Sequence, residues 1–184
     1  MASPPPAPRF CVAVLGSSRP RPGDPDYETA RAVGQELARR GALVVCGGYG
    51  GTMEAVCRGT SEAGGESIGV VIDGSGPPNA WVSRAVTAAD LADRLRLLRD
   101  FSRAAIFLPH GLGTMLELVF FAESIVKGDI PPRPLVLLGD AWKGAVEIAI
   151  GEASTADGRA RLRDSVRYAD EIGPAVAGAL GGEG

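Results

Sequence analysis

The sequence is poor in the features of a disulfide scaffold, a membrane protein or a nucleic-acid-binding protein. It has three cysteines, an odd number with no CxxC pair. Cys11 and Cys46 lie inside apolar runs, so we expect buried, reduced thiols. No apolar run is long enough to span a bilayer. The formal net charge of −3 provides no general attraction for nucleic acid or an anionic membrane.

The N-terminus lacks the basic segment followed by an apolar segment that is typical of a signal peptide. Residues 1–8 are rich in proline and predict a flexible tail. The chain also has no internal repeat, and its 184 residues fit one domain with a substantial core. We therefore expect a cytoplasmic protein in which residues 9–184 form a single domain.

Along this domain, short apolar runs alternate with amphipathic segments. The runs that predict strands occupy residues 9–15, 42–46, 67–72, 104–108, 134–138 and 166–168. The segments that predict helices occupy residues 25–40, 52–63, 88–102, 115–127, 142–151 and 171–180. This alternation is typical of an α/β fold with a parallel sheet that is covered by helices on both faces. We predict a Rossmann-like, doubly wound parallel sheet.

Three glycine-containing turns follow predicted strands, at residues 16–18, 47–51 and 109–114. In a doubly wound sheet, ligands bind beyond the carboxyl ends of the strands. Glycine lets backbone N–H groups approach an anion, and a following helix adds partial positive charge at its N-terminus. One such turn can be a mere corner, but three at one edge predict a site for a phosphorylated small molecule. The candidate binding residues are Gly16, Ser17, Gly47, Gly48, His110, Gly111, Gly113 and Thr114.

An arginine interrupts the apolar face of the helix predicted over residues 88–102. Arg94 falls between Leu91 and Leu98, on the face that carries Leu95. Two interpretations are open. The guanidinium can be directed into the cleft, where a buried charge needs an anionic partner. Alternatively, the arginine lies at the edge of the apolar face, and its head reaches water while its stem packs.

The next predicted helix is apolar on nearly every side and is expected to be mostly buried. Glu117 lies in its first turn, where side chains lean back toward the glycine turn. However, Thr114-x-x-Glu117 is also a capping-box pattern, in which the glutamate only satisfies backbone donors. His110, the only histidine, lies in the turn itself. It is either structural, a hydrogen-bond donor to a phosphate, or a participant in proton transfer.

Together these strings resemble a known family. CGGYGGTMEAV from Cys46, then Arg94, then LPHGLGTMLE ending at Glu117 are similar to the Lonely Guy family, whose signature is PGGxGTxxE. These enzymes are the cytokinin-activating phosphoribohydrolases, formerly labelled lysine decarboxylases. The resemblance covers residues 9–138 and implies that Arg94 and Glu117 are catalytic. It also implies that Gly111, Gly113 and Thr114 hold phosphate and ribose.

The reaction implied by the resemblance is hydrolysis of the N-glycosidic bond of a nucleoside 5′-monophosphate. It implies no cofactor and no metal, and a homodimer. The apolar helix around Phe120 and Phe121 is either the subunit contact or part of the core. The chain departs from the family pattern at three positions. His110 replaces the first glycine of the signature, Leu95 replaces a lysine and Leu116 replaces a glutamate.

Two rival functions follow from the same features. A binding or carrier protein for a phosphorylated ligand such as the molybdenum cofactor would use the same fold and glycine turns without catalysis. A pyridoxal-phosphate decarboxylase would need a lysine for its Schiff base. Lys127 and Lys143 are the only lysines, and neither lies in a turn at a strand end.

Overall fold

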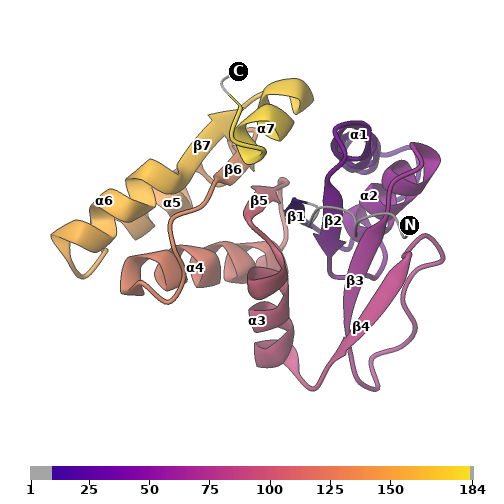
Figure 1. Ribbon diagram of the computed structural model, residues 1–184, viewed down its shortest axis with the longest axis horizontal. Coiled ribbons are helices and arrows are strands. Elements are labelled where there is room, and N and C mark those ends of the chain that lie inside the picture. The colour runs from indigo at the N-terminus through magenta and orange to yellow at the C-terminus, as the bar shows by residue number, and fades with distance from the viewer. Residues whose placement is uncertain (1–9, 183–184) are drawn as a thin grey trace, which may run out of the picture.

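The computed structural model describes residues 10–182, so the tail predicted at residues 1–8 lies outside the described part. Within residues 10–182, seven strands form one parallel sheet in the order β4-β3-β2-β1-β5-β6-β7 (Figure 1). The strands are β1 (Cys11–Leu15), β2 (Leu43–Cys46), β3 (Ser67–Ile72), β4 (Arg84–Ala88), β5 (Ala104–Phe107), β6 (Leu135–Leu138) and β7 (Val166–Ala169). The helices are α1 (Pro25–Arg39), α2 (Thr52–Glu62), α3 (Leu91–Phe101), α4 (Leu112–Lys127), α5 (Lys143–Gly151), α6 (Ala156–Ser165) and α7 (Ile172–Ala179). The predicted Rossmann-like, doubly wound parallel sheet in a single α/β domain is confirmed.

Alternating side chains of the strands divide the core into two layers. In β1, Val12 and Val14 pack with α1, α2 and α7 on one face of the sheet. Ala13 and Leu15 point to the other face, which α3, α4, α5 and α6 cover (Figure 1). This alternation follows from the two-residue period of a strand. Because both faces are covered, the five inner strands are apolar on both sides, as the continuous runs predicted.

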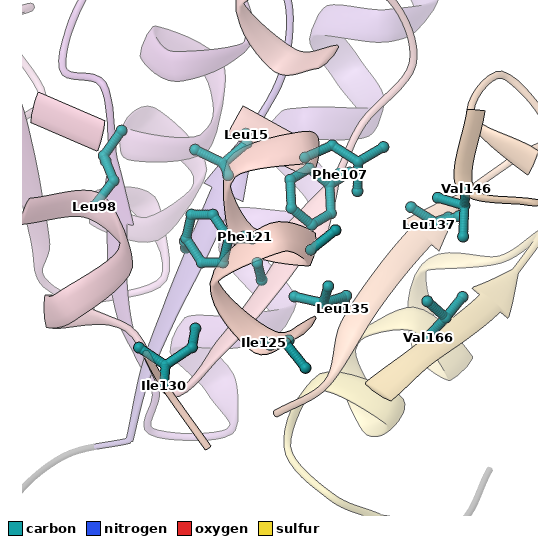
Figure 2. Close-up of a cluster of buried hydrophobic side chains, with 14 of the residues drawn as sticks. Leu15, Leu98, Phe107, Phe121, Ile125, Ile130, Leu135, Leu137, Val146 and Val166 are labelled. Atoms are coloured by element: carbon teal, nitrogen blue, oxygen red, sulfur yellow. The ribbon is translucent and has the colours of Figure 1, made fainter. Parts of the chain in front are cut away.

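Helix α4 forms the centre of the second layer (Figure 2). Phe121 is fully buried and meets the ring of Phe107 edge-on, with the ring centroids 5.9 Å apart. The expectation that α4 is buried on nearly every side fails along one stripe. The exposed apolar side chains of this stripe are Leu112, Met115, Leu116 and Val119. Their spacing places them on one face of the helix, which leaves an apolar surface open to solvent.

The strand order reverses at β1, and this reversal determines where a ligand can bind. Strands β2, β3 and β4 extend to one side of β1, whereas β5, β6 and β7 extend to the other. In the pairing of β1 with β5, Leu15 lies opposite Phe107, so both strands end at the same level. Ligands of doubly wound folds bind in the crevice at such a reversal. Helix α3 precedes β5 in the chain and α4 follows it, and both helices pack on the same face of the sheet.

Two elements were not predicted. Strand β4 is an edge strand whose first two residues are exposed, so it lacks a continuous apolar run. Helix α6 buries little beyond Leu162, and its charged residues hide the helical period. Two helix starts also differ from the predictions. Helix α3 begins at Leu91 after an N-cap at Asp90, and α4 begins within the turn predicted for residues 109–114.

Among residues 10–182, none of the helices combines the length and the apolar character that a bilayer-spanning segment requires.

Candidate functional site

A cavity of about 630 Å³ opens at the carboxyl ends of β1, β2 and β5. All three glycine turns contribute to its walls, together with Arg94 of α3 and the first turns of α4 up to Glu117. The predicted residues that line it are Gly16, Ser17, Gly47, Arg94, Gly111, Gly113, Thr114 and Glu117. The sheet reversal therefore brings together residues that lie up to about one hundred positions apart in the sequence.

Arg94 is held inside this cavity rather than in solvent. Its Nε donates to the backbone oxygen of Val70 at 2.9 Å, and its side chain is only 12% exposed. Nη1 lies 3.5 Å from Oε1 of Glu117, and Nη2 lies 3.8 Å from Sδ of Met53. The ring of Tyr49 covers the guanidinium, with 5.8 Å between Cζ and the ring centroid. The interpretation of Arg94 as a cation directed into the cleft is confirmed.

The turn after β2 leaves room for this guanidinium because it contains no side chain at Gly47. A Cβ atom at this position would lie 1.7 Å from Nη2 of Arg94. No other residue type could be placed there without displacing the arginine. The glycine therefore serves a close approach rather than a tight corner.

Glu117 is buried beside Arg94. Its side chain is 8% exposed, and desolvation raises the pKa of its carboxyl to about 7, against the lowering effect of the Arg94 charge. The capping box is not formed, because α4 begins at Leu112 and Thr114 is already inside its first turn. A carboxyl group with this pKa exchanges its proton near neutral pH, as a general base or acid requires.

The N-terminus of α4 has donors with no acceptor inside the helix. Gly111 is the N-cap with φ +104°, and it has no side chain to receive the N–H groups of the first turn. Within residues 10–182, the buried hydroxyl of Thr114 also has no hydrogen-bond partner. Thr114 lines the cavity and is 1% exposed. Unsatisfied buried donors are costly, so this corner of the cavity is suited to an oxyanion.

Sequence reasoning missed Arg19, which also lines the cavity. Its backbone N–H donates to Oγ of Ser17 at 3.2 Å, and it has no ion pair among residues 10–182. The charged residues that line the cavity are thus Arg19, Arg94 and Glu117. Positive charge exceeds negative charge even when Glu117 is ionised. The signal in the sequence was a cation directly after a glycine turn at a strand end.

Two predicted binding residues lie outside the cavity lining. His110 has φ +67°, and its Nδ1 lies 3.3 Å from Oδ2 of Asp26 at the start of α1. Its side chain is 63% exposed and borders a neighbouring hollow that shares Ser17 and Arg19 with the cavity. Gly48 has φ +75° and approaches Gly69 and Val71 of β3. Both residues shape the turns without facing the Arg94–Glu117 pair.

Three solved structures illustrate the likeness in fold. The molybdenum cofactor carrier protein from Chlamydomonas reinhardtii has 20% sequence identity and a TM-score of 0.74, and the match covers 95% of this chain and 98% of that one. The molybdenum cofactor binding protein from Rippkaea orientalis has 22% identity and a TM-score of 0.71, with 91% and 93% covered. DNA processing protein A from Helicobacter pylori, described for its single-stranded DNA binding, has 18% identity and a TM-score of 0.59, with 94% and 80% covered.

At these identities the likeness concerns the fold alone. A comparison with curated proteins gives no match. A family model, by contrast, matches residues 9–127, which is more than half of the chain and includes every cavity residue named above. The glycine turns, the cavity at the sheet reversal and this match agree: the chain belongs to the SLOG cluster4 family.

Proposed function

We propose that this protein is a phosphoribohydrolase that cleaves the N-glycosidic bond of a nucleoside 5′-monophosphate, of the cytokinin type or related to it. The products are the free base and ribose 5-phosphate. The observation that carries the proposal is the buried Arg94–Glu117 pair in one cavity with the uncapped N-terminus of α4. A reactive carboxyl and an oxyanion site in one cavity suit a substrate with a sugar between its phosphate and its scissile bond.

The phosphate is bound at the N-terminus of α4. First-turn N–H groups and the Thr114 hydroxyl donate to its oxygens. Oγ of Ser17 accepts from Arg19 N–H, so the hydroxyl proton of Ser17 is available to the phosphate as well. The Arg19 guanidinium adds a positive charge at the same wall. Arg19 thus supplies a cation in place of the family's lysine, which is Leu95 in this chain.

Hydrolysis breaks the bond between C1′ and the base nitrogen; the bonding electrons leave with the base, which takes up a proton from solvent. The sugar passes through a cation-like transition state, as in glycoside hydrolysis generally. As a carboxylate, Glu117 stabilises this charge and takes a proton from the water that attacks C1′. A carboxyl with a pKa of about 7 suits proton transfer at neutral pH. Arg94 positions the carboxylate and holds the substrate.

The test is an assay of purified protein with a panel of nucleoside 5′-monophosphates and the matching nucleosides. Free base and ribose 5-phosphate are separated by chromatography and quantified. We expect release from monophosphates, and a loss of about 10²- to 10⁴-fold in kcat for Glu117→Gln, the range for removal of a general base. Full turnover in Glu117→Gln would contradict the role of this residue.

The second candidate function is that of a non-catalytic carrier. It is favoured by the likeness to the molybdenum cofactor carrier protein, whose fold this chain shares over 95% of its length. The same amides and cations would then hold the phosphate of a larger ligand, without turnover. A fluorescent pterin that co-purifies with the protein, together with no release of base from any nucleotide, would support this function.

We also propose that the protein acts as a homodimer through α4. The contact expected around Phe120 and Phe121 is not available in full, because Phe121 is buried in the core. The exposed stripe from Leu112 to Val119 provides an apolar surface on the same helix. We propose no nucleic acid as a partner, since the net charge is −3 and the charged lining of the cavity is confined to three residues.

A further inference from the structure

The segment between β3 and β4 is fastened to the glycine turn after β2 by one side chain. Nδ2 of Asn79 donates to the backbone oxygens of Gly48 at 3.1 Å and Tyr49 at 2.9 Å. The backbone N–H of Asn79 donates to the same Gly48 oxygen at 2.8 Å. Its Oδ1 accepts from the N–H of Trp81 at 3.0 Å. The amide nitrogen of this side chain therefore holds the turn, and its amide oxygen fixes the local backbone at Trp81.

Tyr49, inside that turn, is held at its other end by β3. Its hydroxyl accepts a hydrogen bond from the N–H of Ile72 at 2.8 Å. Its ring lies over the guanidinium of Arg94 and lines the cavity. A tyrosine anchored at both its carbonyl and its hydroxyl cannot rotate, so the ring is a fixed surface. A cation over such a ring is attracted to its negative face.

Arg94 thus has two supports that both depend on β3. The first is direct, from Nε to the oxygen of Val70. The second is the Tyr49 ring, which Ile72 and Asn79 fix in place. Nη1 of Arg94 then contacts Oε1 of Glu117, which comes from α4. Without the ring, the guanidinium could pivot about its bond to Val70.

We propose that Asn79 and Tyr49 are positioning residues, which hold the Arg94 guanidinium against the Glu117 carboxylate and act through Arg94. The effect on turnover rests on the function proposed above, but the effect on geometry does not. In kinetic terms, these residues affect kcat through the Arg94–Glu117 pair. The phosphate site at the N-terminus of α4, which governs KM, is formed by other residues. Arg94 is the charged neighbour that lowers the pKa of Glu117. Displacement of the guanidinium therefore leaves Glu117 with burial alone, and its pKa rises further.

This consequence can be measured without any substrate. The carboxyl of Glu117 is titrated by ¹³C NMR in the full-length protein and assigned through its absence in Glu117→Gln. We expect Asn79→Ala and Tyr49→Leu to raise the pKa by about one unit, the size of a typical effect of one nearby charge. Tyr49→Phe keeps the ring and is expected to give a smaller shift.

Ser83→Ala is the matched control. Oγ of Ser83, in the same segment, accepts from the N–H of Ser67 in β3 at 3.0 Å, so this variant likewise removes a side-chain hydrogen bond of the segment. It leaves the turn at Gly48 and Tyr49 untouched. We expect an unchanged pKa for Glu117 in Ser83→Ala, even if its thermal stability falls as much as that of Asn79→Ala.

The outcomes separate the two proposals. If the pKa rises in the variants but wild type releases no base from any nucleotide, the positioning stands and the hydrolase function fails. If wild type is active and the pKa is the same in wild type, Asn79→Ala and Tyr49→Leu, the positioning inference is overturned. If Asn79→Ala does not fold, the comparison of Tyr49→Leu with Tyr49→Phe decides. In active protein, we also expect kcat to fall about tenfold in Tyr49→Leu while KM changes little.

Discussion

Nη1 of Arg94 and Oε1 of Glu117 lie 3.5 Å apart, although the two residues are 23 positions apart in the chain. One residue comes from the helix that leads into β5 and the other from the helix that leaves it. Both side chains are nearly buried, so each depends on the other for charge compensation.

The pH dependence of stability is expected to reveal Glu117 directly. Its pKa is raised from 4.5 to about 7 on folding, so the folded state favours the protonated form. The associated stability is complete below pH 4.5 and is lost as pH rises through about 7. A shift of this size corresponds to about 3 kcal/mol. Denaturant unfolding across this range should show the loss in wild type and not in Glu117→Gln, and parallel curves would contradict the buried carboxyl.

The pH dependence of activity has the opposite sign. Because the carboxylate is the form that stabilises the cation and accepts the proton, kcat/KM should rise with pH, with a midpoint near 7. Initial rates on one nucleoside monophosphate at constant ionic strength provide the measurement. A profile that is flat or falls over the same range would exclude Glu117 as the group that must be ionised.

Arg19 should matter for the phosphate and not for the chemical step. We expect Arg19→Ala to raise KM about 10- to 100-fold with little change in kcat, the worth of one charge-assisted hydrogen bond. Arg19→Lys should recover part of the loss. Arg21→Ala is the control, since Arg21 is exposed in the same segment but does not line the cavity. Equal effects of Arg19→Ala and Arg21→Ala would indicate a general charge effect instead of a contact.

Gly47→Ala should disable the site while Gly50→Ala leaves it intact. A Cβ at position 47 would overlap Nη2 of Arg94 at 1.7 Å, whereas one at position 50 has nothing within 4 Å. The guanidinium must move, so we expect Gly47→Ala to reduce kcat/KM at least about 100-fold, as a misplaced catalytic group does. Steady-state kinetics with circular dichroism as a folding check tests this. Comparable activity of the two variants would contradict the close approach.

The exposed stripe of α4 predicts the oligomeric state. Light scattering after size exclusion should report a dimer for wild type and a monomer for Val119→Glu, because a buried unpaired charge opposes association. Ile148→Glu is the control, since Ile148 is also exposed but belongs to α5. A monomeric wild type, or equal behaviour of both variants, would show that α4 is not the contact.

The strand and helix pattern was predictable wherever a buried face imposed a period on the sequence. Strands β1, β2, β3, β5 and β6 are buried on both faces and therefore read as continuous apolar runs. The edge strand β4 and the polar helix α6 contribute little to the core, so nothing in their composition marks them. The start of α4 was misplaced because its N-cap is Gly111, which gives no side-chain signal.

The candidate site was predictable where residues departed from the local pattern of the sequence. Arg94 is a charge on an apolar helix face, and glycines are concentrated directly after strands. Asn79 gave no such signal, because its partners at Gly48 and Tyr49 lie 31 and 30 positions away and are backbone oxygens. Contacts of this kind depend on the path of two loops, which side-chain chemistry alone does not reveal. The absence of a hydrogen-bond partner for the buried Thr114 hydroxyl was likewise unpredictable, because it depends on where α4 begins.

Because the strand order reverses at β1, the ligand site is built from both halves of the sheet. The glycine turns after β1 and β2 come early in the chain, whereas Glu117 and the α4 N-terminus follow β5, which pairs with β1. The ligand site is therefore complete only when the two halves of the sheet are joined. A nascent chain that stops before Ala104 would carry Arg94 without its carboxylate partner. A ligand that binds at this site therefore stabilises only the complete folded protein.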